Sequence, residues 1–179
     1  MKRIILLLIP LVTLVSACST TPDGDTYTYR DAMGNTTDLI VDNLLETKEN
    51  EGDLLWLNAS RIGEGREKPR YYLETRYETI PQKGWLHIPA GNSLVLRVNG
   101  QAMKLHTSGS LNTRSTTPSG TFLESAIYPV SAEQLLKISS AKTVEVELSG
   151  ANRVVQRRFA PANTAKFMEF VGNRVNRDT

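Results

Sequence analysis

The sequence predicts an α+β fold: a mainly antiparallel sheet with two or three short helices. Three observations predict it. Residues Tyr71–Glu78 alternate between two faces, which is typical of a half-buried strand. The pair Asn99-Gly100 lies between two apolar-rich runs and is the preferred sequence of a two-residue hairpin turn. Ser131, with Gln134 three residues later, forms a helix capping box.

The segment ahead of the first clear strand fits two structures. We expect Thr36–Glu46 to be a short helix capped by Thr37, with Asp38 near its positive end, although a strand also fits. The helix would have an apolar face made of Leu39, Ile40, Val41, Leu44 and Leu45. Further along we expect short strands at Leu54–Ala59 and Trp85–Ile88, a charged loop at Arg61–Arg70 and a turn at Pro81–Gly84.

The Asn99-Gly100 turn predicts the register of a hairpin over Ser93–His106. A two-residue turn pairs Val98 with Gln101, Leu96 with Met103, and Leu94 with Leu105. The core face then holds Leu94, Leu96, Met103 and Leu105, and the other face holds Ser93, Arg97, Lys104 and His106. The Ser/Thr/Gly-rich stretch Thr107–Thr121 follows as a long loop, and such loops are either functional or disordered.

The C-terminal part is expected to run strand, helix, strand, strand, helix. The strands are Thr121–Tyr128, Lys142–Ser149 and Asn152–Phe159, the last two joined by a Gly150-Ala151 turn that places Val155 and Phe159 on the face of Val144, Val146 and Leu148. The first helix follows Ser131, with a hydrophobic staple between Val130 and Leu135. The last helix begins near Pro161, has Thr164, Phe167, Met168 and Val171 on one face, and stops at Gly172. The stretch Tyr128–Val171 resembles domains of uncharacterised bacterial envelope lipoproteins, and that resemblance implies no catalytic residues.

The N-terminus has the pattern of an export signal. Lys2 and Arg3 precede the apolar run Ile4–Val15, which is too short to span a bilayer comfortably. The ending Val15-Ser16-Ala17-Cys18 resembles the lipobox of bacterial lipoproteins. The resemblance implies cleavage of residues 1–17, a diacylglycerol on the Cys18 thiol, and a fatty acid such as palmitate on the freed amine.

The lipobox also predicts a location. Ser19 follows the cysteine, and in Gram-negative lipoproteins this favours the outer membrane, with the domain facing the periplasm, over the inner membrane or the cell surface. Residues 18–26 are then a lipidated N-terminus and tether, and residues 27–179 a single α+β domain. Cys18 is the only cysteine of the chain, so lipidation explains its lack of a partner. The alternative is an ordinary signal peptide with an accidental cysteine.

The charges of the mature chain balance but are unevenly distributed. Of 21 Lys and Arg, two lie in the leader, which leaves 19 against 19 acids. Zero net charge and export argue against a nucleic-acid partner. Residues 23–53 hold nine acids and two bases, whereas residues 150–179 hold six bases and two acids. Two interpretations are open: solvated faces that pack near each other, or a basic patch for an acidic partner.

Few residues suit catalysis. The two histidines, His87 and His106, belong to no metal-binding motif, and no metal or cofactor is expected. Ser108 and Ser110 lack the surroundings of a nucleophile elbow, although a pairing with His106 stays open. Glu145 and Glu147 share a strand face, where Arg157 and Arg158 are expected to form cross-strand ion pairs with them.

The candidate contact residues are aromatic and basic. Aromatic side chains can stack on sugars or anchor a protein partner. We expect contacts to a ligand or partner from Tyr72, Trp85, Arg157, Arg158 and Arg174. The favoured function is a non-enzymatic, membrane-anchored module that is structural or binds an envelope protein. The alternatives are a module that binds cell-wall glycan or another envelope ligand, and an unrecognised hydrolase.

Overall fold

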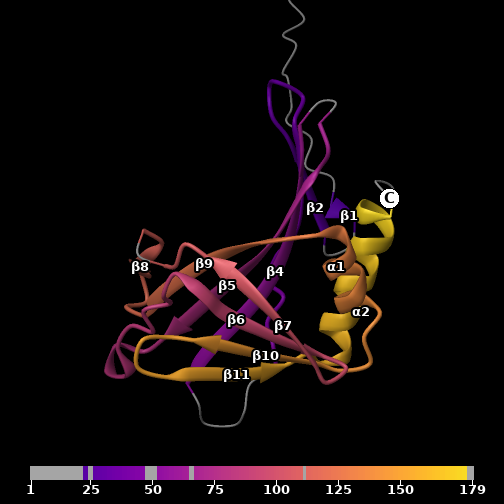
Figure 1. The fold of residues 1–179 in the computed structure, drawn as a ribbon. Coiled ribbons are helices and arrows are strands. Elements are labelled where there is room, and N and C mark those ends of the chain that lie inside the picture. Colours follow the sequence, from indigo (N-terminus) through magenta and orange to yellow (C-terminus); the bar gives the residue numbers. More distant parts are fainter. Residues whose placement is uncertain (1–21, 24–25, 47–51, 65–66, 111, 177–179) are drawn as a thin grey trace, which may run out of the picture.

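The computed structural model describes residues 22–23, 26–46, 52–64, 67–110 and 112–176. Within them, two antiparallel sheets and two α-helices form the fold, as the α+β prediction expects (Figure 1). The predicted signal peptide, the lipobox and Cys18 lie outside the described residues. Pro22, Asp23 and Thr26, which the sequence places in the tether, belong to strands.

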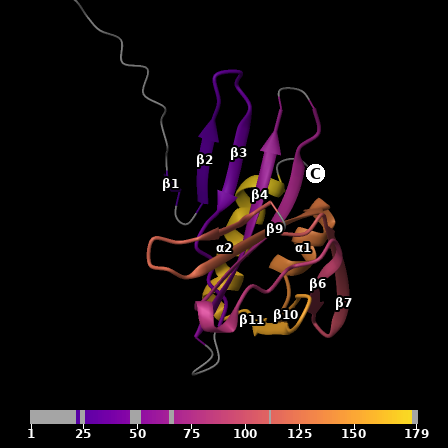
Figure 2. The same cartoon turned by 90° about the vertical axis from the view of Figure 1, so that its left-hand side faces the viewer.

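The larger sheet has seven strands in the described chain, in the order β1-β2-β3-β4-β5-β9-β8. Their bounds are β1 (Pro22–Asp23), β2 (Thr26–Arg30), β3 (Thr36–Ile40), β4 (Asp53–Gly63), β5 (Arg70–Thr79), β8 (Arg114–Thr116) and β9 (Phe122–Val130). The predicted alternation of β5 is confirmed, since Tyr71, Leu73, Thr75 and Tyr77 are buried. The β2–β3 and β4–β5 pairs project beyond the rest of the molecule (Figures 1 and 2).

The smaller sheet has the order β11-β10-β6-β7. Its strands are β6 (Gly91–Val98), β7 (Gln101–Thr107), β10 (Val144–Ser149) and β11 (Val154–Arg158). The predicted β6–β7 register is confirmed at all three pairs. Asn99 and Gly100 both have positive φ, 50° and 83°, as a type I′ turn requires. One face was misjudged, because a register shift between Gly91 and Leu94 leaves Ser93 buried.

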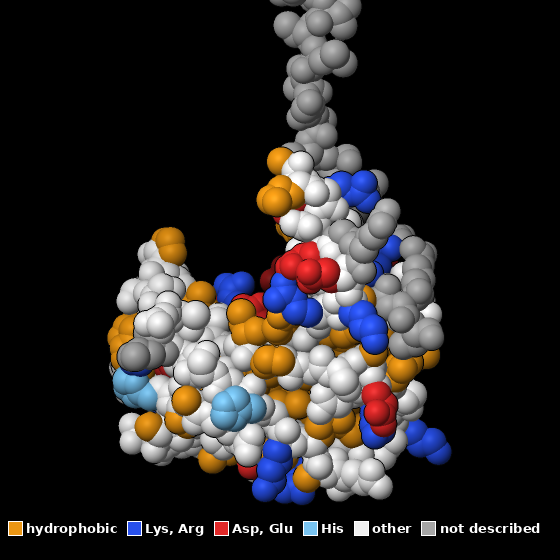
Figure 3. Space-filling model, turned by 45° about the horizontal axis from the view of Figure 1, so that its top comes forward, with side chains coloured by type: hydrophobic (Ala, Val, Ile, Leu, Met, Phe, Trp, Pro, Cys, Tyr) orange, Lys and Arg blue, Asp and Glu red, His pale blue; other side chains and the backbone are white. Residues whose placement is uncertain are grey.

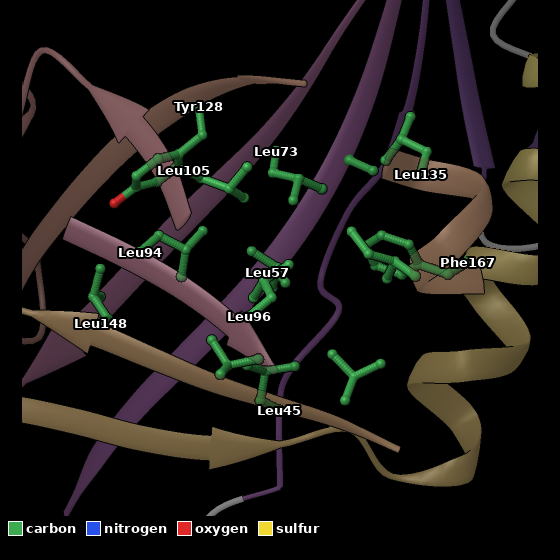
Figure 4. Close-up of a cluster of buried hydrophobic side chains, with 14 of the residues drawn as sticks. Leu45, Leu57, Leu73, Leu94, Leu96, Leu105, Tyr128, Leu135, Leu148 and Phe167 are labelled. Carbon is green, nitrogen blue, oxygen red and sulfur yellow. The ribbon is translucent and has the colours of Figure 1, made fainter. Parts of the chain in front are cut away.

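The core lies between the two sheets and is closed at one end by the helices. Leucines of β4, β5, β6, β7 and β10 meet in it, together with Leu135 and Phe167 of the two helices (Figure 4). Both sheets contribute fully buried side chains, including Leu57 and Leu73 from the larger sheet and Leu94 and Leu96 from the smaller one. Burial of this apolar surface is the main stabilising contribution to the fold.

The helices are α1 (Ala132–Ser139) and α2 (Pro161–Phe170). The capping box of α1 is confirmed, with Ser131 and Gln134 bonded in both directions. The predicted stop at Gly172 is wrong, because α2 continues as a π-helical turn, Val171–Val175. Glycine in a helix costs about 1 kcal/mol, less than the roughly 1.5–3 kcal/mol gained by burying a valine such as Val175. Met168, predicted for the apolar face, is 59% exposed.

Thr36–Glu46 is not the expected helix; the strand alternative is confirmed for Thr36–Ile40, and an irregular segment follows in which Asp42 has a φ of 52°. Asp38 and Ile40 point inward while Thr37 and Leu39 are half-buried, so the burial has the period of a strand. The chain then runs between the sheets, with bridges from Leu44 to Trp56 of β4 and from Glu46 to Arg158 of β11. Tertiary pairing on both sides therefore decides the conformation.

Three connections also differ from expectation. β4 extends to Gly63 inside the predicted 61–70 loop, and β8 lies inside the predicted 107–121 loop. The predicted Gly150-Ala151 turn is wrong, because Ser149 pairs with Val154 and the Gly150 N–H donates to the Arg153 carbonyl at 2.8 Å. The connection is therefore Gly150–Arg153, and the Ala151 N–H donates outward to the carbonyls of Leu86 and His87. Val155 therefore pairs with Leu148 and not with Val146, as the predicted turn would require. Because the register differs by two residues, Val155 stays on the predicted face of the strand.

Candidate functional site

The five predicted contact residues do not form one site. Tyr72 is half-buried on β5 and lines a hollow of about 400 Å³ with Pro69 and Pro129. Trp85 stacks on Phe122 with ring centroids 4.2 Å apart, so its ring takes part in packing. The three arginines lie elsewhere and contact acidic side chains.

Each predicted arginine pairs with an acid from the N-terminal acidic segment. Arg157 pairs with Asp53 at 2.8 Å, Arg174 with Asp38 at 3.3 Å, and Arg158 with Glu46. The exposed Arg158 guanidinium lowers the pKa of Glu46 by its hydrogen bond and its charge. The acidic and basic segments therefore pack against each other, as one of the two interpretations predicts. The Asp53 and Asp38 pairs are largely buried, however, whereas Arg158 is 71% exposed.

One of these pairs belongs to a larger polar group, the Asp53 cluster, which we define as Asp53, Tyr77, Lys83, Arg153 and Arg157. Asp53 begins β4 and points inward. Its carboxylate accepts hydrogen bonds from Tyr77 Oη at 2.7 Å and from Arg157 Nη2 at 2.8 Å, and Lys83 Nζ lies 3.6 Å away. Two hydrogen-bond donors and one ammonium group, from three different elements, therefore surround the carboxylate.

Arg153 joins the cluster through neutral partners. Its guanidinium donates to Tyr77 Oη at 3.0 Å and to the carbonyls of Lys83 and Gly84, at 2.7 and 3.0 Å. These bonds hold the β10–β11 turn against the 3₁₀ turn Pro81–Lys83. Burial is the largest influence on Tyr77 and raises its pKa, so this hydroxyl stays protonated and donates to Asp53.

The Asp53 cluster carries more positive than negative charge. Three cations surround one carboxylate, and they line a cleft of about 230 Å³ together with Val154, Val155 and Gln156. Lys83 is the most exposed of the three cations, with its side chain 36% exposed; Arg153 is half-buried and Arg157 is only 2% exposed. Such a cleft attracts anions. Sequence reasoning found only Arg157, because the other members lie on ordinary strands and turns with no local spacing that joins them.

A second buried acid, Glu124, organises the chain around His87. Its carboxylate accepts backbone N–H groups of Leu86, His87 at 3.0 Å and Ile88 at 3.3 Å, and the Ser110 hydroxyl at 2.7 Å. These bonds explain why Trp85–Ile88 is not the strand that the sequence predicts, because the backbone N–H groups of residues 86–88 donate to the Glu124 side chain and not to a neighbouring strand. His87 has a positive φ of 55° there.

The histidines are not brought together. His87 Nδ1 lies 2.9 Å from Arg114 Nη1, whereas His106 is exposed on β7. Ser110 is buried, and its hydroxyl contacts the Glu124 carboxylate and the Ile88 carbonyl. Within the described ranges, no group of three His, Cys, Asp or Glu side chains could hold a metal ion.

The expected ion pairs of Glu145 and Glu147 are mostly replaced by other contacts. Arg157 points to the opposite face of β11, and Arg158, although level with Glu145, pairs with Glu46. Glu147 accepts instead from Gln156 Nε2 at 3.2 Å. These side chains border a hollow of about 460 Å³ on the outer face of the smaller sheet.

The sequence matches no protein-family model and no curated protein. Of the helices in the described part of the chain, none has the length and apolar character needed to cross a membrane.

Proposed function

We propose that this protein is a lipid-anchored lipoprotein of the outer membrane whose folded part is a non-enzymatic module for an anionic protein partner. The lipobox and the single Cys18 support the anchor. The Asp53 cluster supports the binding role and is the observation that carries it: an open cleft with three cations around one carboxylate.

The larger sheet places the proposed membrane anchor and the Asp53 cleft near opposite ends of its strands. Asp53 and Gly63 are the two ends of β4, and ten residues of strand span about 33 Å. β3 pairs with the Gly63 end, and β1 lies beyond β2 on that side of the sheet (Figure 2). A protein anchored through the chain that precedes β1 would therefore present the Asp53 cleft away from the membrane.

A protein partner is favoured over a glycan. The Trp85 ring stacks on Phe122 and is half-buried, so it is a poor platform for a sugar ring. β7 is the outermost strand of the smaller sheet in the described chain and pairs there only with β6, which leaves an edge for backbone pairing. Val154, at the mouth of the cleft, is 53% exposed and offers an apolar contact.

Crosslinking in intact cells tests the binding role. A photo-crosslinking amino acid at Val154 should capture a partner, and Lys83→Glu should reduce its yield at least tenfold because it reverses the accessible charge. Lys142→Glu makes the same charge change at an exposed position outside the cleft and should leave the yield unchanged. Equal yields in both variants would sink the proposed role of the cleft.

The anchor is tested separately. Cys18→Ala should abolish lipid attachment, measured by mass spectrometry, and should remove the protein from outer-membrane fractions after a high-salt wash. Retention of this variant with the outer membrane would contradict lipidation at Cys18.

A further inference from the structure

The β2–β3 turn is closed by several hydrogen bonds and exposes an apolar side chain. Asp31 Oδ1 accepts the N–H groups of Met33 and Asn35, both at 2.9 Å, and Asp31 Oδ2 accepts Asn35 Nδ2 at 2.8 Å. Two backbone bonds, Asp31 N to Asn35 O and Gly34 N to Asp31 O, close the turn. The turn is thus held in one shape, and Met33 is 88% exposed on it.

The turn projects from the molecule and exposes apolar side chains, one arginine and the Asp31 carboxylate. The β2–β3 hairpin stands clear of the smaller sheet (Figures 1 and 2). Tyr29 on β2 is 48% exposed, and Arg30 and Ala32 are exposed as well. Figure 3 shows hydrophobic side chains gathered at this projecting end. Tyrosine, aliphatic and basic side chains together are typical of the boundary between water and lipid.

The register of β1 brings the lipidated cysteine within reach of this turn. β1 is antiparallel to β2, with Pro22 opposite Tyr27, so β1 followed backward from Asp23 to Pro22 points toward the turn. Cys18 is four residue steps before Pro22, a reach of at most about 14 Å. Asp31, the residue after β2, is four residue steps beyond Tyr27, about 13 Å in the strand direction. The two lengths match, so the lipid and the turn can meet one membrane plane.

We infer that the β2–β3 turn lies against the membrane that holds Cys18, with the Met33 side chain in the lipid headgroup region. This rests on the proposed lipidation of Cys18. The hydrogen bonds from Asn35 lower the pKa of Asp31. One methionine and one tyrosine bind a membrane weakly, but the anchor makes the contact intramolecular. The contact therefore orients the domain and directs the Asp53 cleft away from the bilayer.

Fluorescence on the full-length, lipidated protein tests the inference. Met33→Cys adds the only free thiol, since the lipid occupies Cys18, and an environment-sensitive dye is attached to it. In vesicles of phosphatidylethanolamine and phosphatidylglycerol, we expect a blue shift, quenching by headgroup spin labels, and several-fold protection from aqueous iodide. The matched control, Val154→Cys, labels an exposed apolar position at the other end and should show none of these effects.

The outcomes separate the inference from the proposed anchor. A lipidated protein whose Met33 dye is as accessible to iodide as the Val154 dye overturns the inference alone. If mass spectrometry finds no lipid on Cys18, the anchor and the inference fail together. A second check attaches the dye at position 29 through Tyr29→Cys and then adds Met33→Asp. The added charge should return that dye to water while the protein stays lipidated, and an unchanged protection of the dye would overturn the inference.

Discussion

Arg157 Nη2 lies 2.8 Å from Asp53 Oδ1, although 104 residues separate the two side chains in sequence. Arg157 belongs to the smaller sheet and Asp53 to the larger one, so this pair joins the sheets at one end of the core. Both side chains are more than nine-tenths buried. The pair is therefore structural as well as a component of the candidate cleft.

Removing the arginine should destabilise the protein strongly. Arg157→Leu leaves the Asp53 carboxylate buried with only Lys83 and Tyr77 as partners, and breaking a buried pair costs about 3 kcal/mol or more. Urea denaturation measures this as a lower midpoint. Arg158→Leu is the matched control, because the Arg158 pair with Glu46 is exposed and should contribute little. Equal midpoints for the two variants would show that the Asp53 pair is not formed in solution.

Glu124 should be as important for stability as any core leucine. Glu124→Ala leaves several buried backbone donors without an acceptor, at about 1–3 kcal/mol for each one. We expect a large fall in the free energy of unfolding and faster hydrogen exchange at His87 and Ile88. Glu145→Ala, at an exposed position, is the control. Unchanged exchange at these amides would contradict the hydrogen bonds described for Glu124.

The protein should lose stability in alkali. Burial raises the pKa of Tyr77 and Tyr128 above the ordinary value of 10.0. The folded state therefore holds both phenolic protons more tightly than the unfolded chain does. This contribution is fully present below the ordinary pKa and is lost as the pH rises through the raised values. Urea midpoints measured upward from pH 9, a value about one unit below the ordinary pKa, should fall, and less steeply in Tyr77→Phe and Tyr128→Phe.

Two glycines should respond to substitution with opposite signs. Gly100 has a φ of 83°, and Gly100→Val should lower the melting temperature, since an L residue in this region costs about 1–2 kcal/mol. Gly172 is helical, and a Cβ added there would meet open space, so Gly172→Ala should raise stability by up to about 1 kcal/mol. A Gly100→Val melting curve identical to that of the parent would contradict the turn.

Neither histidine is expected to be needed for activity. His87 contacts Arg114, and His106 is exposed on another element. The double variant His87→Gln with His106→Gln should complement a gene deletion that has an envelope phenotype, provided that it folds and localises normally. Failure of a folded, localised double variant to complement would favour a histidine-dependent reaction.

Local patterns predicted the elements that depend on local chemistry. Asn99-Gly100 predicted the hairpin register, because a two-residue turn with positive φ leaves a single pairing. Ser131 with Gln134 predicted the start of α1, because both bonds of the capping box lie within four residues. The alternation over Tyr71–Glu78 predicted the inward face of β5, because strand side chains alternate with period two.

The sequence alone therefore determined the α+β class, the hairpin, the capping box and the expectation that Cys18 carries a lipid. The tertiary structure decided the rest. Residues 36–46 are not helical because β2 and β4 pair with Thr36–Ile40, and Leu44 and Glu46 form bridges to the two sheets. Residues 85–88 are not a strand because Glu124 accepts their N–H groups. The Asp53 cluster and the position of the β2–β3 turn relative to the N-terminal chain also depend on tertiary structure. Asp53 and Arg157 are 104 positions apart in sequence, and the pairing of β1 with β2 places Pro22 opposite Tyr27. A local sequence pattern reflects interactions between residues that are close in sequence, whereas these contacts depend on the pairing of strands that are distant in sequence.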